Sequence, residues 1–255
     1  MNRWLRSFGI DPPTFYTSLK GLRRFWRDYH KIETLNSSTS YPWIIKPNYP
    51  CLHDFYGQSG VASGHYFHQD LYVAQKIFRN APIKHVDVGS RIDGFVAHVA
   101  SFRALEVFDY RELSPIIPNV TFRQFDLLSV PAQLDACCDS LSCLHVLEHI
   151  GLGRYGDPID LSGHLRALES LAKLLKPKGT LYLSTPIGAE RIEYNAHRVF
   201  SLKRISGWFA TLFEIVDFSY VDDAGHLHTE ANLQEVIERS EEFTYSLAIF
   251  ELRRI

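Results

Sequence analysis

The chain has 255 residues, of which 45% are hydrophobic and 13% aromatic, which is enough apolar material for one large α/β domain with an appended segment. Its formal net charge of −2 gives no overall signal for nucleic-acid binding. The four cysteines form neither a disulfide framework nor a paired metal pattern, and no stretch resembles a membrane span or a secretory signal. We therefore expect a reduced, cytoplasmic protein.

The beginning of the chain is basic and amphipathic. Leu19, Leu22, Trp26 and Tyr29 recur at helical spacing. The cations of this segment are Arg3, Arg6, Lys20, Arg23, Arg24, Arg27 and Lys31, against the acids Asp11 and Asp28. The pattern predicts a basic helix that either packs its aromatic stripe on the main domain or makes weak peripheral contact with an anionic lipid or polymer.

Residues 36–64 are rich in Pro, Gly, Ser and Tyr and predict a loop region. We expect an N-terminal segment over residues 1–64 and a main domain over residues 65–255. Residues 65–78 predict a helix that begins with Tyr66 and Phe67. The segment before the first strand commonly folds over the cofactor in nucleotide-binding α/β domains. Tyr66 is therefore a candidate cofactor contact, with an ordinary core aromatic as the alternative.

A strand, a tight turn and a helix start are predicted over residues 83–100. The apolar run at residues 83–88 carries Asp87, breaks at Gly89 and resumes with helical spacing after Gly94. A glycine turn lets a ligand approach the backbone, and its amides offer hydrogen-bond donors. A carboxylate here would repel a pyrophosphate, whereas it can accept hydrogen bonds from the cationic amino-acid part of S-adenosylmethionine. The pattern favours that cofactor.

Two further acids end the next two predicted strands. Residues 104–110 carry Asp109 and residues 120–128 carry Asp126. A doubly wound fold has an acid at the end of its second strand that accepts hydrogen bonds from ribose hydroxyls, and Asp126 is expected to reach an adenine amino group. Each acid alone is more often a solvated strand-end residue, but three in this order favour a cofactor site.

The fourth predicted strand, residues 140–144, is followed by His145, Glu148 and His149, and then by a glycine-rich loop with Asp157. Ligands in open α/β sheets bind outside the carboxyl ends of the strands, so we expect this cluster to face the pocket. The loop suits a substrate-facing turn.

The remainder of the chain continues the alternation of strands and helices. Expected elements are an amphipathic helix at 162–179 ended by Pro177 and Gly179, a strand at 180–186, a helix at 202–209, a strand at 213–220 and a last strand at 245–255. This order predicts an α/β, Rossmann-like doubly wound fold with a mostly parallel seven-stranded sheet and an antiparallel terminal hairpin. An N-terminal helical and loop extension precedes it.

The motifs HVDVGS, HVLEHI, LLKPKGTLYLSTP and HRVFSLKRISGWF make the chain resemble the class I S-adenosylmethionine-dependent methyltransferases over about residues 65–255. The phrase HVLEHIGLGRYGDPID, with GSRIDGF and NAHR, is also similar to an uncharacterised methyltransferase-like family of unknown function. The resemblance implies S-adenosyl-L-methionine as the cofactor. Together with the patterns above it gives the expected cofactor contacts Asp87, Gly89, Ser90, Arg91, Gly94, Asp109, Asp126, Leu127, His145 and Tyr66.

The turn departs from the family pattern. Where the family usually has glycines four and six places after the acid, this chain has Arg91 and Asp93, with Gly94 one place later. Arg91 could pair with the cofactor carboxylate or with Asp93, or could narrow the pocket.

Methyl transfer from a sulfonium is an in-line displacement, so the protein mainly positions the nucleophile and removes its proton. A histidine base suits a hydroxyl acceptor because its pKa lies near neutrality. His149 is the first candidate, followed by His145 and His197, with Glu148 or Asp157 to orient the imidazole. A structural role for any single histidine is an equal alternative. We assign no metal site, although a Mg²⁺-assisted variant around some of these residues stays open.

The leading hypothesis is O-methylation of a small molecule or a sugar, including polysaccharide modification. The alternative is a non-catalytic binding or scaffold protein that keeps the methyltransferase fold. Nucleic-acid methylation is disfavoured by the neutral charge balance and by the lack of an N-P-P-Y or D-P-P-Y motif. An oxidoreductase is disfavoured because GSRIDG has GxxxxG rather than GxGxxG spacing.

Overall fold

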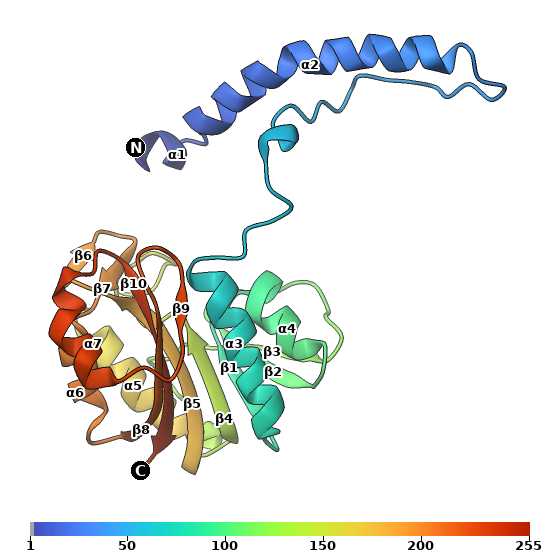
Figure 1. Cartoon of the computed structure of the whole chain (residues 1–255). Coiled ribbons are helices and arrows are strands. Elements are labelled where there is room, and N and C mark those ends of the chain that lie inside the picture. Colours follow the sequence, from blue (N-terminus) through green and yellow to red (C-terminus); the bar gives the residue numbers. More distant parts are fainter. Residues whose placement is uncertain (1–2) are drawn as a thin grey trace. The chain divides into compact units, whose positions relative to one another are not determined.

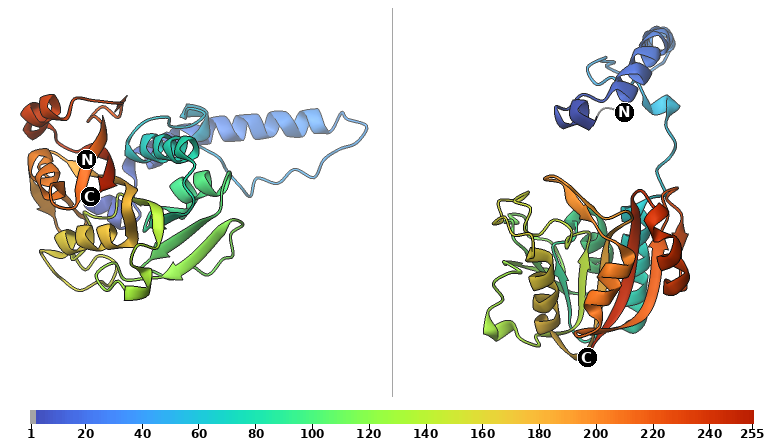
Figure 2. Two further views of the ribbon diagram at one scale, coloured as in Figure 1. Left: turned by 90° about the horizontal axis from the view of Figure 1, so that it is seen from below. Right: turned by 90° about the vertical axis from the view of Figure 1, so that its left-hand side faces the viewer.

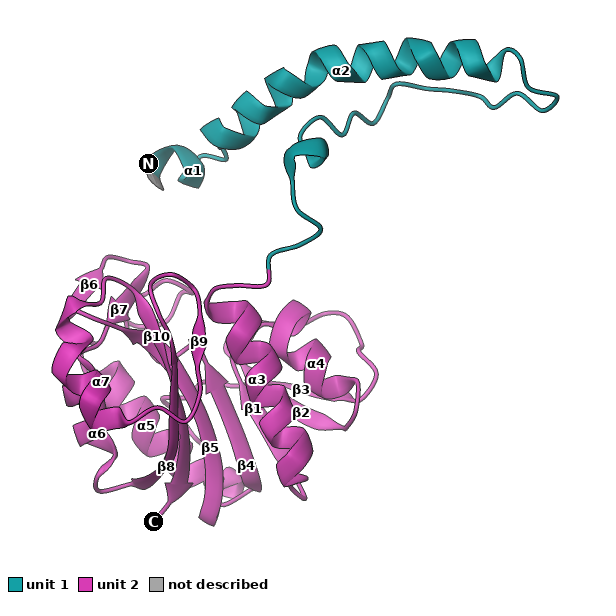
Figure 3. Ribbon diagram, in the orientation of Figure 1, with its two compact units in different colours: residues 1–61 teal, residues 62–255 magenta. Residues whose placement is uncertain are grey.

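The computed structural model describes residues 3–255 and divides into two compact units, residues 1–61 and 62–255 (Figure 3). The first two residues of the predicted N-terminal segment lie outside the described residues. The two units meet in sequence within the predicted loop region, and the domain boundary after residue 64 stays a prediction.

Unit 1 contains one long helix. The helices are α1 (Arg3–Ser7), α2 (Pro12–Asn36) and the short 3₁₀ turn η1 (Asp54–Tyr56). Two prolines open α2, where their missing amides and fixed φ cost nothing. After α2 the chain turns back, and Asn36 fixes the turn by bonding the backbone amide and carbonyl of Trp43 at 2.7 and 2.9 Å.

Unit 2 is built on an eight-stranded sheet with the order β3-β2-β1-β4-β5-β10-β8-β9 (Figure 1). The strands from β3 through β5 run parallel, while β10 is antiparallel to both β5 and β8. Their bounds are β1 His85–Val88, β2 Leu105–Asp109, β3 Val120–Gln124, β4 Cys138–Leu144, β5 Leu175–Ile187, β8 Phe213–Val221, β9 Leu227–His228 and β10 Ser246–Arg254. The predicted doubly wound α/β fold and its antiparallel hairpin are confirmed.

The sheet has one strand more than the predicted seven. The extra strand, β9, has two residues and pairs with the end of β8 across a turn that Asp222 fastens by accepting the backbone amides of Ala224 and His226. A two-residue strand is too short to give a period-2 pattern, so the sequence did not indicate it.

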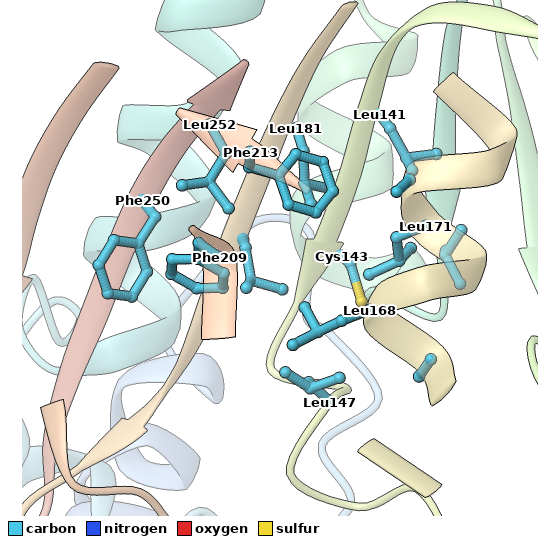
Figure 4. Packing of buried hydrophobic residues seen from close by; sticks show 14 of the residues in the cluster. Leu141, Cys143, Leu147, Leu168, Leu171, Leu181, Phe209, Phe213, Phe250 and Leu252 are labelled. Atoms are coloured by element: carbon cyan, nitrogen blue, oxygen red, sulfur yellow. The ribbon is translucent and has the colours of Figure 1, made fainter. Parts of the chain in front are cut away.

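Helices cover both faces of the sheet, because its central strands are apolar on both sides. On one face, α5 and α6 pack against β4, β5 and β10, where Leu168, Leu181 and Phe250 lie in one core (Figure 4). On the other face, α3 and α4 form a second core around Val73 and Val99 (Figure 2). The helices are α3 His65–Asn80, α4 Ala97–Ala100, α5 Gly163–Leu174, α6 Leu202–Phe209 and α7 Leu233–Arg239, with short 3₁₀ turns at η3 Ala132–Leu134 and η4 Ser240–Glu242.

Three predicted boundaries differ from the structure. Helix α5 ends at Leu174 and β5 begins at Leu175, so Pro177 and Gly179 lie inside the strand, where a register shift against β4 accommodates them. The helix after the glycine turn begins as the π-helical segment η2 (Ile92–Val96) before α4. The segment predicted as a loop forms the hairpin of β6 (Arg191–Glu193) and β7 (His197–Val199).

No helix within residues 3–255 combines the length and apolar character needed to cross a membrane. The parallel strands β1, β2, β3 and β4 end at the same edge of the sheet. The residues that follow them therefore meet there.

Candidate functional site

A cavity opens at the carboxyl edge of the parallel strands, with about 710 Å³ of empty space that includes its open mouth. Its walls come from the ends of β1 and β2 and from the loops after β3 and β4. The lining residues are Val88, Gly89, Phe108, Asp109, Tyr110, Arg111, Phe125, Asp126, Leu127, Leu128, His145, Val146, His149, Ile150, Tyr155 and Asp157. The lining includes half of the residues that the sequence pattern selected, namely Gly89, Asp109, Asp126, Leu127, His145, His149 and Asp157.

Asp87 near the end of β1 stabilises the turn that follows this strand. Its fully buried carboxylate accepts the amide and hydroxyl of Ser90 at 3.0 and 2.6 Å and the hydroxyl of Ser142 at 2.5 Å. Burial raises the pKa of Asp87 to about 6, against the hydrogen bonds from Ser142 and Ser90, which lower it. With three protein donors in place, Asp87 and Ser90 shape the loop; their direct contact with a cofactor stays a prediction.

Gly89 is the residue that lets a ligand approach this turn. Its φ of +72° lies in the left-handed region, and an added Cβ would lie 3.0 Å from the side chain of Val146. A side chain here would fill the cavity wall between β1 and β4.

Asp109 lines the cavity, but a neighbouring arginine occupies its carboxylate. Arg111 donates from Nε and Nη2 at 3.1 and 2.9 Å, and its backbone amide donates at 2.8 Å. The Arg111 guanidinium also lies 4.6 Å from the ring centroid of Tyr155. A ribose would have to share Asp109 with this pair or displace it. Sequence reasoning did not select Arg111, although it follows Asp109 by only two residues.

Asp126 and Leu127 line the part of the cavity next to β3. The backbone amide of Leu128 donates to Asp126 Oδ1 at 2.8 Å, which leaves the other carboxylate oxygen for a ligand. Leu127 is buried and Tyr110 lines the same space. A carboxylate beside apolar walls is the arrangement expected for a flat ring with an amino group.

Arg91 and Asp93, which stand in place of the family's glycines after β1, pair with each other. Arg91 pairs with Asp93 at 3.1 and 2.9 Å and lies 4.9 Å from the ring centroid of Tyr66. An added Cβ at Gly94 would lie 2.4 Å from Oδ2 of Asp70, so a larger residue there would have to displace that carboxylate. Arg91, Gly94 and Tyr66 do not line the 710 Å³ cavity.

A buried chain of hydrogen bonds links three side chains beside the cavity. His145 Nδ1 lies 2.5 Å from Glu148 Oε1, and His145 Nε2 lies 3.1 Å from His65 Nδ1. His65 Nε2 in turn lies 3.1 Å from the carbonyl oxygen of Tyr245. His65 was not selected from the sequence, because nothing in the pattern pairs it with a residue 80 positions away.

The hydrogen-bond partners along this chain indicate which ring nitrogens of His65 and His145 carry protons. The Tyr245 carbonyl can only accept, so the His65 proton lies on Nε2. Burial and the charge of His145 lower the pKa of His65 to about 4, so His65 is neutral near pH 7 and its Nδ1 accepts from His145.

Glu148 completes the assignment. Burial raises its pKa, but the charge and hydrogen bond of His145 outweigh this effect, so the pKa of Glu148 lies below its ordinary value. The ionised carboxylate therefore accepts a hydrogen bond from His145 Nδ1. Because both ring nitrogens of His145 then face acceptors, we infer that His145 is an imidazolium in a buried ion pair with Glu148.

His149 has the opposite protonation. Its Nδ1 lies 2.6 Å from the carbonyl oxygen of Ala196, which can only accept, and 3.3 Å from Nη1 of Arg154, which can only donate. The shorter contact favours a proton on Nδ1. Burial lowers the pKa of His149, and its Nε2 lies 3.8 Å from Glu148 Oε1; with the proton on Nδ1, Nε2 would carry the lone pair. Of the three candidate histidines, this one combines a place in the cavity lining with an open nitrogen.

His197 and Asp157 have other surroundings. His197 in β7 lies with its ring 6.4 Å from that of His149 and 4.9 Å from that of Tyr245, and it does not line the cavity. Asp157 accepts backbone amides of its own loop, from Gly151 at 2.8 Å and Tyr155 at 3.2 Å. It therefore shapes the loop at the cavity mouth and orients no histidine. Within residues 3–255, no group of three or more His, Cys, Asp or Glu side chains is arranged to hold a metal ion.

Comparison with known families identifies the chain. The family model described as Caenorhabditis protein of unknown function, DUF268, matches residues 121–254, which is more than half of the chain. The chain belongs to the DUF268 family. The matched part of this DUF268 chain contains Asp126, His145, Glu148 and His149, whereas β1 and its glycine turn precede it. No curated protein matches the sequence.

Several solved methyltransferases are similar to the DUF268 chain. The N-methyltransferase NodS from Bradyrhizobium japonicum WM9 in complex with S-adenosyl-L-homocysteine matches at 12% identity and a TM-score of 0.49, over 89% of this chain and 97% of that chain. The 1,6-didemethyltoxoflavin-N1-methyltransferase of Burkholderia thailandensis matches at 12% identity and a TM-score of 0.49, over 96% and 91% of the two chains. A putative sarcosine dimethylglycine methyltransferase from Galdieria sulphuraria matches at 13% identity and a TM-score of 0.48, over 73% and 85%.

At these identities and TM-scores, the similarity gives no information about the function of the DUF268 chain. The doubly wound fold of the DUF268 chain, with β10 antiparallel to both β5 and β8, rests on its own strand order and strand directions.

Proposed function

We propose that this chain is an S-adenosylmethionine-dependent methyltransferase that O-methylates a small molecule or a sugar, with polysaccharide modification as one such reaction. The observation that carries the proposal is the cavity in which Asp109 and Asp126 lie beside apolar walls and next to a neutral His149. These are the groups that a nucleoside and a hydroxyl acceptor together require.

The hydrogen-bond acceptors of the cavity fit the cofactor. Asp109 would accept hydrogen bonds from the ribose hydroxyls, and Asp126 would accept one from the adenine amino group. Gly89 leaves the space that a Cβ would fill beside Val146. When bound, the cofactor supplies an electrophilic methyl group on a sulfonium sulfur.

His149 is the residue that would take the acceptor proton. Its Nε2 carries a lone pair, and the proton it gains would make an imidazolium 3.8 Å from the Glu148 carboxylate, which stabilises that charge. His145 is unsuited to this role because both of its ring nitrogens already carry protons. It would instead form a fixed wall between the cofactor and the acceptor.

A second cavity supports a polar acceptor. A hollow of about 780 Å³ shares His145 with the first cavity and is lined by aromatic rings and by the turn between β8 and β9. Its lining includes the aromatic side chains of Tyr66, Tyr245 and His65 and the carboxylates of Asp222 and Asp223. Flat apolar faces with a few polar groups suit a sugar or another hydroxylated ring.

The alternative is a non-catalytic binding or scaffold protein. The pair of Arg111 with Asp109 favours it, because the protein's own side chain occupies the carboxylate on which a ribose would depend.

Isothermal calorimetry with S-adenosylhomocysteine tests the proposal. We expect the full chain to bind it and Asp109→Ala to lose binding. Absence of heat with the unaltered chain at millimolar ligand would favour the scaffold. A second assay supplies tritium-labelled S-adenosylmethionine with separated glycan and small-molecule fractions. Cofactor binding without label in either fraction would contradict the proposed O-methylation.

A further inference from the structure

Unit 1 carries large apolar side chains that its own residues leave uncovered. Over residues 4–61 the only buried residue is Gly21. The exposed large apolar side chains up to the end of α2 are Trp4, Leu5, Phe8, Ile10, Phe15, Tyr16, Leu19, Leu22, Trp26, Ile32 and Leu35. An amphipathic helix gains most of its stability from the surface that covers its apolar face, so α2 requires such a surface.

One side of α2 is already covered within unit 1. The returning chain passes so close to Gly21 that an added Cβ would lie 1.8 Å from the carbonyl oxygen of Leu52. The guanidinium of Arg24 lies 3.3 Å from the ring centroid of Phe55. These contacts fix which side of the helix faces the returning chain.

The uncovered side carries a continuous apolar stripe. Phe15, Leu19, Leu22 and Trp26 follow one another at spacings of four, three and four residues, which keeps them on one face of a helix. Their exposed fractions are 66%, 53%, 41% and 45%. The stripe is therefore about three turns long.

Cations lie to one side of this stripe. At about 100° per residue, Arg23, Arg27, Lys20 and Lys31 follow the stripe around one side of the helix. Over the whole of α2, five cations oppose two acids, and Asp28 is already paired with Arg24 and Arg27 at 3.1 and 2.8 Å. Among the described residues, Lys20, Arg23 and Lys31 have no ion pair, so their charge is available to an anionic partner.

We propose that α2 docks on an anionic lipid surface, with the stripe at the level of the head groups and the cations against lipid phosphates. Aromatic and leucine side chains on one face and Lys or Arg beside them are the features of helices that lie in a membrane interface. A purely anionic polymer would meet the cations but leave the stripe in water. A second copy of α2 would bring a second set of like charges against the first.

Flotation of the full chain with vesicles tests this docking. We expect the protein to float with phosphatidylcholine vesicles that contain about one-third phosphatidylserine and not with pure phosphatidylcholine vesicles. Binding should be lost at about 1 M salt, where the Debye length falls to about 3 Å. Failure to float with the anionic vesicles at low salt would overturn the proposal.

A triple variant tests whether vesicle binding depends on the cations of α2 or only on the net charge of the protein. Lys20→Gln, Arg23→Gln and Lys31→Gln together should weaken binding by about a hundredfold, at about fivefold for each cation. The matched control removes three exposed lysines from unit 2, Lys173→Gln, Lys176→Gln and Lys203→Gln, with the same change in net charge. Equal weakening by both variants would mean that α2 is not the docking surface.

A second variant tests the stripe. Leu22→Ser with Trp26→Ser should weaken binding while the circular dichroism and the melting temperature of unit 2 stay unchanged, because neither side chain is buried. Unchanged vesicle binding would contradict docking through the stripe. Sedimentation without vesicles adds a further check: a dimer that this variant dissociates would show that a second copy covers the stripe, and would overturn the proposal.

Discussion

The buried ion pair between His145 and Glu148 gives a quantitative prediction. Glu148→Gln keeps the size of the side chain and removes the carboxylate that lies 2.5 Å from His145 Nδ1. Glu148 is fully buried, so solvent cannot replace the lost charge. His145 must then release a proton or remain an uncompensated buried cation.

The size of the loss follows from the hydrogen bonds. A neutral His145 retains one N–H, so it must give up its bond either to residue 148 or to His65. A lost hydrogen bond involving a charged group costs about 1.5–3 kcal/mol, below the roughly 3–5 kcal/mol of a buried charge that cannot neutralise itself. We expect the free energy of unfolding of unit 2 to fall by about 2–3 kcal/mol and its melting temperature by about 4–12 °C.

The assay is urea and thermal unfolding followed by circular dichroism near neutral pH. The control is Glu169→Gln on the exposed side of α5, for which we expect a change within about 0.5 kcal/mol. Since the pKa of Glu148 is lowered in the folded state, its contribution is present above the ordinary value of 4.5 and shrinks as the pH falls below it. A Glu148→Gln protein as stable as the unaltered chain would refute the ion pair, as would ¹⁵N chemical shifts that report a neutral His145.

Three further outcomes are expected. His149→Ala should retain S-adenosylhomocysteine binding and lose methyl transfer, measured by calorimetry and by label incorporation; normal turnover would remove His149 as the base. Arg111→Ala should raise the affinity for S-adenosylhomocysteine about 1.5- to 5-fold, because a ligand no longer competes with a half-exposed ion pair; a loss of affinity would mean that Arg111 itself contacts the ligand. The free energy of unfolding, measured by urea titration, should fall as the pH is lowered from about 6.5 to about 4, because three buried neutral histidines take up protons on unfolding. They outnumber the two buried carboxyls, Asp70 and Asp87, whose raised pKa acts in the opposite direction; constant stability over this range would contradict the prediction. These histidines are His65 and His164, each with a pKa lowered by burial to about 4, and His85, with a pKa lowered by burial to about 3.

The sequence predicted the edge of the sheet at which the site lies. Asp109 and Asp126 each close an apolar run, and parallel strands end at one edge, so local pattern and topology together bring these carboxylates into one cavity with His145 and His149. The fold class followed from the same alternation of strands and helices.

The sequence could not predict which hydrogen-bond partners the site side chains, such as Asp87 and His145, already have within the protein. The donor from Ser142 that helps to saturate Asp87 comes from 55 positions along the chain, and the bond of His65 to His145 spans 80 positions. Such pairings depend on the register of β1 against β4 and on the entry of α3, which no local pattern encodes. For the same reason Pro177 was interpreted as a helix end, although tertiary pairing with β4 extends β5 through it.

A crystal of the full chain soaked with S-adenosylhomocysteine is the most direct measurement of where a cofactor binds. We expect density for the nucleoside in the 710 Å³ cavity, with the ribose at Asp109 and the adenine amino group at Asp126. Density elsewhere, or an unchanged pair of Asp109 with Arg111 at saturating ligand, would contradict the account.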